Sequence, residues 1–288
     1  MHDAVRAMIE RYECRTRGDY VNALREILQE LALLGLWRSK FFEHAAFYGG
    51  TALRVLYGLD RYSEDIDFSL LKPAPDFSLG AYGDALQREI NGFGFHVTFE
   101  DRGRGLQTAV ESAFLKANTY RQLLVIQTDQ ALLRGLHPEK WLKVKLEVDT
   151  DPPGGFQTES RYLLRPIPFP VRAYSLPDLF AGKLHAVLFR RWQSRTKGRD
   201  WYDLTWYVGR HPRLRLRHLE LRMRQSGDYE EDAPLSPAAL TERIRAAVDE
   251  LDVDQARNEV APFLRDPSVL DAWSRDFFMQ IAERIEIV

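Results

Sequence analysis

The sequence predicts an α+β protein, in which a mixed sheet flanked by helices is followed by a helical C-terminal domain. Residues 141–149, WLKVKLEVD, alternate apolar and polar side chains, as a strand with one buried face does. Residues 47–70 read as a strand, a Gly-Gly turn, a short helix and a second strand. From residue 175 onward apolar residues recur at helical spacing. We therefore expect a mixed domain over residues 1–165 and a helical domain over 166–288.

The first half of the chain is expected to begin with a helix. Residues 19–34 carry leucines and isoleucine at helical spacing. A second helix is expected around residues 82–91, and strands at 93–99 and 122–128. A Pro/Gly-rich segment from Asp151 to Pro170 is interpreted as the separator between the two halves.

The helical half is expected to open at Ser175, which can cap a helix that has Pro177 in its first turn. Lys183 lies on the apolar side of that helix. Such a lysine either extends its ammonium along the apolar surface to water or directs it to a ligand. The next helix begins within KGRDWYDL, where Asp200 and Asp203 are one turn apart. A structural salt bridge or a cap competes there with a functional role.

Composition excludes several classes of protein. Of 288 residues, 45% are hydrophobic and 28% charged, which is ordinary for a soluble globular protein. No apolar run of 18 residues occurs, and the N-terminal residues lack the apolar core of a signal peptide. The single cysteine, Cys14, excludes an internal disulfide, and the seven histidines form no Cys/His metal cluster. We expect a reduced, cytoplasmic protein without membrane contact, monomeric by default.

Charge is distributed unevenly along the chain. Residues 190–224 hold eleven basic and three acidic side chains, whereas residues 225–288 hold six basic and fifteen acidic ones. The basic block either faces a polyanion such as a nucleic acid, or belongs to solvated helical faces that partly neutralise each other.

Asp65 and Asp67 are the strongest candidates for catalytic carboxylates. Three Asp-x-Asp triplets occur, so the triplet alone means little. This one lies on an alternating strand, about fifteen residues after a Gly-Gly turn. Two carboxylates on one strand face suit Mg²⁺, and the Gly49-Gly50-Thr51 turn at a helix start suits a phosphate. A solvated strand face is the competing interpretation.

Further candidates lie on the strand at 141–149. Glu147 is the best third carboxylate if this strand pairs with the Asp65/Asp67 strand, and Asp149 is its rival. Lys145 either reaches a phosphate or balances Glu147. Arg54 and Arg61 contact phosphates or pair structurally. No GxxxxGK[ST], GxGxxG or GxSxG motif occurs, which favours a hydroxyl activated by a metal over a covalent route.

Four segments together carry a family resemblance. The segments GGTALRVLYGLDRYSEDIDFSL, KVKLEVD, SLPDLFAGKLHAVLFRR and KGRDWYDL resemble, in this order, the four motifs of AbiEii/AbiGii-type nucleotidyltransferase toxins. This group is also called MenT and belongs to the DNA polymerase β superfamily. The motifs span about residues 47–204, over half of the chain.

The resemblance implies a polymerase-β-like core and a set of site residues. Asp65 and Asp67 would hold Mg²⁺, with Mn²⁺ as a substitute, and the looser second motif leaves Glu147 or Asp149 as the third ligand. Lys183 and Asp200 would be contributed by the helical domain to the cleft, with Lys183 on the nucleotide phosphates. The triphosphate site would be lined by Gly49, Gly50, Thr51 and Ser63, together with Lys145.

The implied function is that of a toxin in a toxin–antitoxin or abortive-infection system. Such an enzyme would transfer nucleotides from an NTP to RNA, most plausibly to the tRNA 3′ acceptor end, and so block translation. A cognate antitoxin would be its partner. The alternatives are transfer to a small molecule or protein side chain, and a non-catalytic nucleic-acid-binding module.

Overall fold

The computed structural model describes residues 3–104, 110–118, 141–190 and 198–288. The chain divides into two compact units. The first unit comprises Met1–Tyr57, Ser63–Pro152 and Ser160–Ala173, and the second comprises Gly58–Tyr62, Pro153–Glu159 and Tyr174–Val288. Two short segments of the second unit therefore interrupt the first unit in sequence, one before β2 and one that ends within β6 of the sheet described next.

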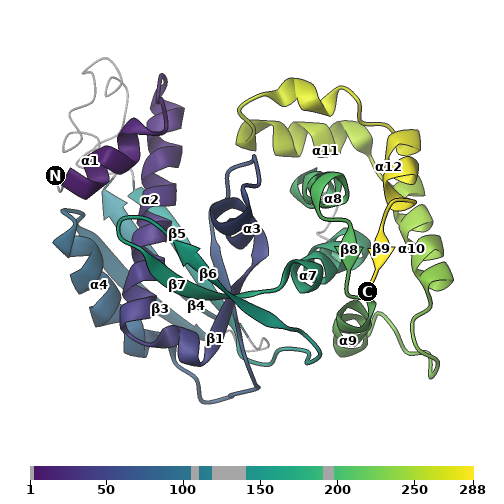
Figure 1. Ribbon diagram of the computed structural model, residues 1–288, viewed down its shortest axis with the longest axis horizontal. Coiled ribbons are helices and arrows are strands. Elements are labelled where there is room, and N and C mark those ends of the chain that lie inside the picture. The colour runs from purple at the N-terminus through teal and green to yellow at the C-terminus, as the bar shows by residue number, and fades with distance from the viewer. Residues whose placement is uncertain (1–2, 105–109, 119–140, 191–197) are drawn as a thin grey trace. The chain divides into compact units, whose positions relative to one another are not determined.

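The first unit is built on a sheet of seven described strands (Figure 1). Their order is β3-β4-β5-β2-β1-β7-β6. The sheet is mixed, because β1 is antiparallel to β2 but parallel to β7, and β2 is parallel to β5, whereas β4 is antiparallel to both β3 and β5. The strands are β1 Ala45–Tyr48, β2 Ile66–Leu70, β3 Val97–Arg104, β4 Val110–Asn118, β5 Trp141–Asp149, β6 Thr158–Leu163 and β7 Phe169–Tyr174.

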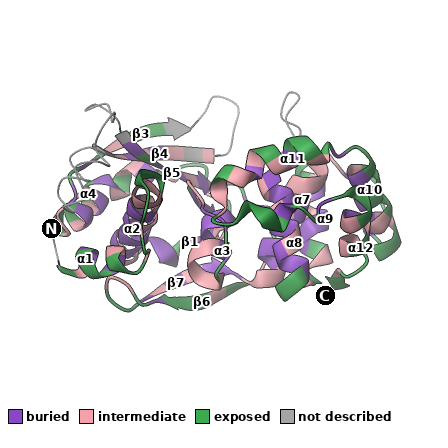
Figure 2. Cartoon of the chain, turned by 90° about the horizontal axis from the view of Figure 1, so that it is seen from above, coloured by how far each residue is buried: buried purple, intermediate pink, exposed green. Residues whose placement is uncertain are grey.

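Helices of the first unit cover this sheet. They are α1 Asp3–Glu10, α2 Arg17–Arg38, α3 Gly49–Tyr57 and α4 Gly83–Gly92, with short 3₁₀ turns at Phe41–Glu43 and Leu79–Tyr82. A capping box starts α2: Thr16 accepts a hydrogen bond from the Asp19 amide at 3.2 Å, and the Asp19 carboxylate accepts one from the Thr16 amide at 2.7 Å. The central part of α2 is buried almost all round, because this helix packs on α1, α4 and the sheet (Figure 2).

The second unit is helical. Its main helices are α7 Leu176–Phe189, α8 Gly198–Arg210, α9 Leu216–Ser226, α10 Pro237–Asp249, α11 Val253–Val260 and α12 Arg275–Ala282. Helix α7 packs on α8, α9 and α10, and Phe180 of α7 stacks on Tyr207 of α8 with ring centroids 4.4 Å apart. Short turns at Ala261–Phe263 and Pro267–Leu270, and a parallel pair of β8 Arg213–Leu214 with β9 Glu286–Ile287, complete it.

The mixed sheet flanked by helices and the helical C-terminal part are thus confirmed. Two local predictions need correction, and one strand was missed. The strand expected at 93–99 begins at Val97 and runs to Arg104, and β4 was not expected. The separator from Asp151 to Pro170 contains β6 and the start of β7. The strand expected at 122–128 lies outside the described residues.

Strands β6 and β7 were not predicted, and each has a physical reason. Most of β6 is exposed at the edge of the sheet, so no apolar alternation marks it. A proline stands at the second position of β7, which argues against a strand in sequence. No helix in the part of the chain that the structure describes is long and apolar enough to cross a membrane.

Candidate active site

The candidate carboxylates of the first unit lie at the start of β2. Asp65 directly precedes the strand and is exposed, and Asp67 lies within it and is half-buried. Strand β2 pairs in parallel with β5, and Asp67 is aligned with Glu147. Because aligned residues of neighbouring strands share a face of the sheet, Asp67 and Glu147 lie side by side on the same face. The strand pairing on which the Glu147 candidate depended is thus present.

Glu147 has a cationic neighbour on its own strand. The Lys145 ammonium lies 2.6 Å from the Glu147 carboxylate, and both side chains are about one-third exposed. Asp149 is aligned with Ser69, two pairs further along, and accepts a hydrogen bond from the Asp151 amide at 3.0 Å. Glu147 is therefore the carboxylate next to Asp67, as expected, but it is balanced by Lys145.

No three His, Cys, Asp or Glu side chains among the described residues gather closely enough to hold one metal ion. The ligand set Asp65, Asp67 and Glu147 stays a prediction. Its chemistry still suits a hard divalent cation, since Mg²⁺ is commonly bound by one or two protein carboxylates together with substrate phosphates.

The Gly-Gly turn is shaped by Asp67. Gly49 has a φ of +82°, a conformation that residues with a side chain rarely adopt. A Cβ atom at this position would also overlap the Asp67 carboxylate. Glycine is thus required twice, once for the backbone conformation and once for the space that Asp67 occupies.

Thr51 and Ser63 have different environments. Thr51 is fully buried in the first turns of α3, and its hydroxyl donates a hydrogen bond to the Asp65 carbonyl. Ser63 is half-buried, and its carbonyl accepts a hydrogen bond of 3.1 Å from the Gln29 amide. Sequence reasoning missed Gln29. The one available signal was an amide within the leucine-rich stretch of α2.

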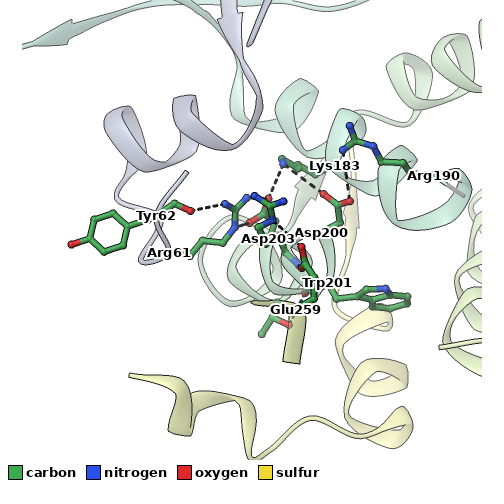
Figure 3. Close-up of polar contacts among 10 residues, drawn as sticks. Arg61, Tyr62, Lys183, Arg190, Asp200, Trp201, Asp203 and Glu259 are labelled. Carbon is green, nitrogen blue, oxygen red and sulfur yellow. Dashed lines mark hydrogen bonds and ion pairs between the residues drawn. The ribbon is translucent and has the colours of Figure 1, made fainter. Parts of the chain in front are cut away.

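Lys183 of the second unit ends in an ion-pair cluster (Figure 3). Its ammonium lies 2.8 Å from the Asp203 carboxylate and 3.8 Å from that of Asp200. Arg190 approaches the other oxygen of Asp200 at 3.9 Å. The Lys183 side chain is only 15% exposed, so it does not extend along the surface to water. The ion pair to Asp203 is the reason.

Asp203 is the centre of this cluster and is fully buried. It also binds Arg61 in a two-pronged pair, with Nε–Oδ1 at 2.6 Å and Nη2–Oδ2 at 2.7 Å. Burial opposes the charged carboxylate, but Arg61 and Lys183 outweigh it and hold the pKa of Asp203 below its usual value. The structural-pairing interpretation thus applies to Arg61, and likewise to Arg54, which pairs with Glu26 at 2.8 Å.

The two aspartates of the fourth motif, Asp200 and Asp203, have different environments. Asp203 is fully buried and pairs with Arg61 and Lys183, so the structural salt bridge given above as the competing interpretation applies to it. We call it the structural hub. Asp200 is 6% exposed, and among the described residues its cation contacts are the two longer ones, to Lys183 and Arg190. The hub could not be foreseen, because Arg61 and Asp203 are 142 residues apart in the chain.

Arginines of the basic block 190–224 are largely engaged by carboxylates in its described part. The pairs are Arg199–Glu259, Arg210–Asp60, Arg215–Asp178 and both Arg217 and Arg224 with Glu220. Of these pairs, Arg199–Glu259 joins the basic block to the acidic block 225–288, and the others are made with carboxylates outside the acidic block. Ser175 stands at the N-cap of α7, but its hydroxyl donates to the Asp178 carboxylate instead of accepting from a backbone amide. The expected side-chain cap is therefore wrong.

Comparisons with known proteins agree with the motifs. Residues 31–278 match the family model described as nucleotidyl transferase AbiEii toxin, type IV TA system. Among solved structures, JHP933 from Helicobacter pylori is similar at 17% identity and a TM-score of 0.53, covering 92% of this chain and 91% of that one. This likeness shows the fold. The nucleotidyltransferase toxin MenT4 from Mycobacterium tuberculosis aligns at 18% identity with a TM-score of 0.48, covering 98% and 99%. The comparison with curated proteins finds no match.

Proposed function

The chain belongs to the AbiEii nucleotidyltransferase toxin family, and we propose that it transfers nucleotides from an NTP to the tRNA 3′ acceptor end and so blocks translation. Family membership makes it a nucleotidyltransferase toxin of a type IV toxin–antitoxin system, with an antitoxin as partner. The RNA acceptor and the residue roles that follow are proposals. The observation that carries them is the placement of Asp67 beside Glu147 and over the glycine turn of α3.

The β2 carboxylates fit a divalent metal. Asp65 is exposed and Asp67 half-buried, so both are accessible to an ion, and the missing side chain of Gly49 leaves room for the Asp67 carboxylate. When bound, Mg²⁺, or Mn²⁺ in its place, would polarise the α-phosphate and favour the ionised form of the attacking hydroxyl. Asp65 and Asp67 would hold the metal together with phosphate oxygens. Glu147 would become a further ligand by giving up its ion pair with Lys145.

The start of α3 suits the triphosphate. Backbone N–H groups of Gly49, Gly50 and Thr51 lie in the first turn of this helix, where amides lack intrahelical partners and the helix dipole favours an anion. Thr51 would act through its amide, because its hydroxyl is engaged by Asp65. Ser63, and Lys145 once released from Glu147, would add contacts to the phosphates.

Lys183 and Asp200 are proposed as the contribution of the helical domain predicted over 166–288. Lys183 would neutralise phosphate charge by exchanging part of its contact with Asp203 for the triphosphate. Asp203 would stay charged after that exchange, because Arg61 binds both of its oxygens. Asp200 would orient Lys183 through the longer contact of 3.8 Å.

The reaction is a substitution at phosphorus. The 3′-hydroxyl oxygen of the acceptor forms a bond to the α-phosphorus of the NTP, the bond from that phosphorus to the bridging oxygen breaks, and pyrophosphate leaves with it. The hydroxyl proton passes to solvent. The net products are an RNA longer by one nucleotide and pyrophosphate.

A second candidate keeps the reaction and changes the acceptor to a small molecule or a protein side chain. The ion pairs of the basic block favour it, because these arginines already have partners. The two acceptors differ in salt dependence. Transfer to RNA should fall steeply as salt rises, since phosphate contacts release counterions, whereas transfer to a neutral small molecule should change little.

The experiment uses total tRNA whose 3′-terminal diol is either intact or oxidised by periodate. Each of the four NTPs, labelled at the α-phosphate, is incubated with the protein, Mg²⁺ and either tRNA. The proposal predicts label on intact tRNA and none on oxidised tRNA. Equal labelling of intact and oxidised tRNA would show that the acceptor is not the 3′ end. Labelling of the protein alone would support the second candidate.

A further inference from the structure

The backbone that leads into β2 is held at three consecutive carbonyl groups. The Gln29 side-chain amide donates to the carbonyls of Ser63 and Glu64, at 3.1 and 3.0 Å, and the Thr51 hydroxyl donates to the carbonyl of Asp65. Both donors belong to helices, Gln29 to α2 and Thr51 to α3. We call this arrangement of Gln29 and Thr51 on residues 63–65 the carbonyl clamp.

Both side chains of the clamp are buried. Gln29 is 1% exposed and Thr51 is fully covered. A buried polar group without a hydrogen-bond partner is costly, so each donor strongly favours the one backbone position that satisfies it. The two protons of a single amide group account for both the Ser63 and the Glu64 carbonyl. Helix α2 is held in place by its packing in the core, so Gln29 anchors the loop to a rigid element.

The glycine turn and the Thr51 hydroxyl of the clamp lie on one helix, α3, and act on two nearby aspartates. The first residue of α3, Gly49, lies beneath the Asp67 carboxylate, and Thr51, two residues later, holds the backbone of Asp65. Two like charges two residues apart repel each other, so convergence on one cation depends on the protein fixing their backbone. Gln29 and the Thr51 hydroxyl supply this constraint, because both donate to backbone carbonyls of residues 63–65.

We propose that Gln29 and the Thr51 hydroxyl are positioning residues, which fix the backbone of residues 63–65 so that Asp65 and Asp67 bind the catalytic metal together. This inference rests on the proposed function for the metal and adds the part of the chain that orders it. Loss of groups that orient metal ligands typically costs about 10- to 100-fold in metal affinity or activity. The same range is expected for the clamp.

The test compares isosteric and conservative variants. Thr51→Val removes only the hydroxyl, Thr51→Ser keeps it, and Gln29→Met removes both amide donors at similar volume. Thr16→Ala is the matched control, because it weakens the capping box of the same helix as Gln29 without touching residues 63–65. Three quantities are measured: hydrogen–deuterium exchange of the amides of residues 63–67, the Mn²⁺ concentration for half-maximal thermal stabilisation, and the KM for NTP.

The clamp predicts that Thr51→Val and Gln29→Met speed exchange at residues 63–67 and raise the half-saturating Mn²⁺ concentration about 10- to 100-fold. Thr51→Ser should restore both quantities, and Thr16→Ala should change neither. Unchanged exchange and unchanged Mn²⁺ response in Thr51→Val would overturn the inference. So would a raised KM for NTP at normal metal response, since that result assigns the hydroxyl to the nucleotide. A wild-type protein that neither responds to metal nor transfers label contradicts the proposed function instead, and the exchange data still decide whether the clamp orders the loop.

Discussion

Two sets of carboxylates in this molecule are positioned by opposite means. Asp65 and Asp67 are accessible, and the loop that leads to them is held through neutral hydrogen bonds to its backbone. Asp203 is fully buried, and its own carboxylate is held by the cations Arg61 and Lys183. The hydrogen bonds described for the first set act on the backbone before the carboxylates, whereas the ion pairs of Asp203 act on the buried carboxylate itself.

This difference determines which carboxylates can take up a metal ion and which are committed to an ion pair. A metal ion can bind an accessible carboxylate at little desolvation cost, whereas ligation by Asp203 would leave two buried cations uncompensated. The same contrast explains why similar Asp pairs, Asp65/Asp67 and Asp200/Asp203, are assigned different roles. The following predictions test this contrast, beginning with the largest effect.

Replacing Asp203 by Asn should cause the largest loss of stability. The change leaves Arg61 and Lys183 buried without their countercharge, which typically costs about 3–5 kcal/mol in the free energy of unfolding. Denaturant unfolding measures it. Asp200→Asn is the control and should cost clearly less, because the cation contacts of Asp200 in the described part of the chain are longer, at 3.8 and 3.9 Å. Equal losses would contradict the hub role of Asp203.

Glu30 offers a buried carboxyl whose pH response is opposite to that of Asp203. One of its oxygens is buried with no hydrogen-bond partner in the described structure. Burial is the main cause that raises the pKa of Glu30 to about 7, and Glu26 adds to it against the cations Arg165, Arg11 and Arg54. Between the ordinary pKa near 4.5 and 7 the native state holds the extra proton, so stability falls as pH rises through this window.

Glu30→Gln should remove that dependence. The variant should match the wild type near pH 4.5 and exceed its free energy of unfolding by about 3 kcal/mol above pH 7, since each pKa unit is worth about 1.36 kcal/mol. Asp203, whose pKa is lowered, contributes stability that is lost as pH falls below the ordinary range of an aspartate. Unfolding curves at several pH values measure both. A constant difference between wild type and Glu30→Gln would show that Glu30 does not titrate in this window.

Lys183 tests whether a cation of the buried cluster also serves the reaction. Lys183→Ala should abolish transfer and weaken NTP binding, yet cost only about 2 kcal/mol of stability, because Asp203 keeps its pair with Arg61. Lys183→Arg should recover little activity, because a forked guanidinium does not replace a compact ammonium. Equilibrium NTP binding and unfolding are measured on the same samples. A fully active Lys183→Ala protein would show that Lys183 has a structural role and no role in transfer.

The smallest effect is expected at an exposed pair of the second unit. Asp60 and Arg210 are 3.2 Å apart, but their side chains are 57% and 51% exposed. Asp60→Asn should therefore change the free energy of unfolding by less than about 1 kcal/mol. A loss comparable with that of Asp203→Asn would show that burial does not distinguish these ion pairs.

Local patterns explain what the sequence predicted correctly. Strand β2, the glycine turn and helix α7 are marked by alternation, by two consecutive glycines and by helical spacing, all within short windows. The edge strand β6 lacks such a pattern because both of its faces are largely exposed. The sequence made Glu147 a candidate if its strand paired with that of Asp67, and the structure supplies the pairing and the register that align the two residues.

The contacts that organise the site were beyond local reasoning. Gln29 and the carbonyls it binds are 34 and 35 residues apart, and Arg61 and Asp203 are 142 residues apart. Such pairs form only because the fold brings their elements together, and neither partner's neighbours in sequence indicate the other. Arg61 in particular was equally compatible with a phosphate contact until its buried partner was known.

The most direct test is the transfer of label from an α-labelled NTP to tRNA by the wild-type protein and by Asp67→Asn, at equal protein concentration and with Mg²⁺. Asn keeps the shape of Asp over Gly49 while removing the charge that binds the metal, so the fold should survive with a melting temperature within a few degrees of the wild type. The account predicts Mg²⁺-dependent label on tRNA that falls at least about 100-fold in the variant, a loss of roughly 2.7 kcal/mol in transition-state stabilisation. Wild-type levels of transfer by Asp67→Asn, or no transfer by the wild type with any NTP, would contradict it.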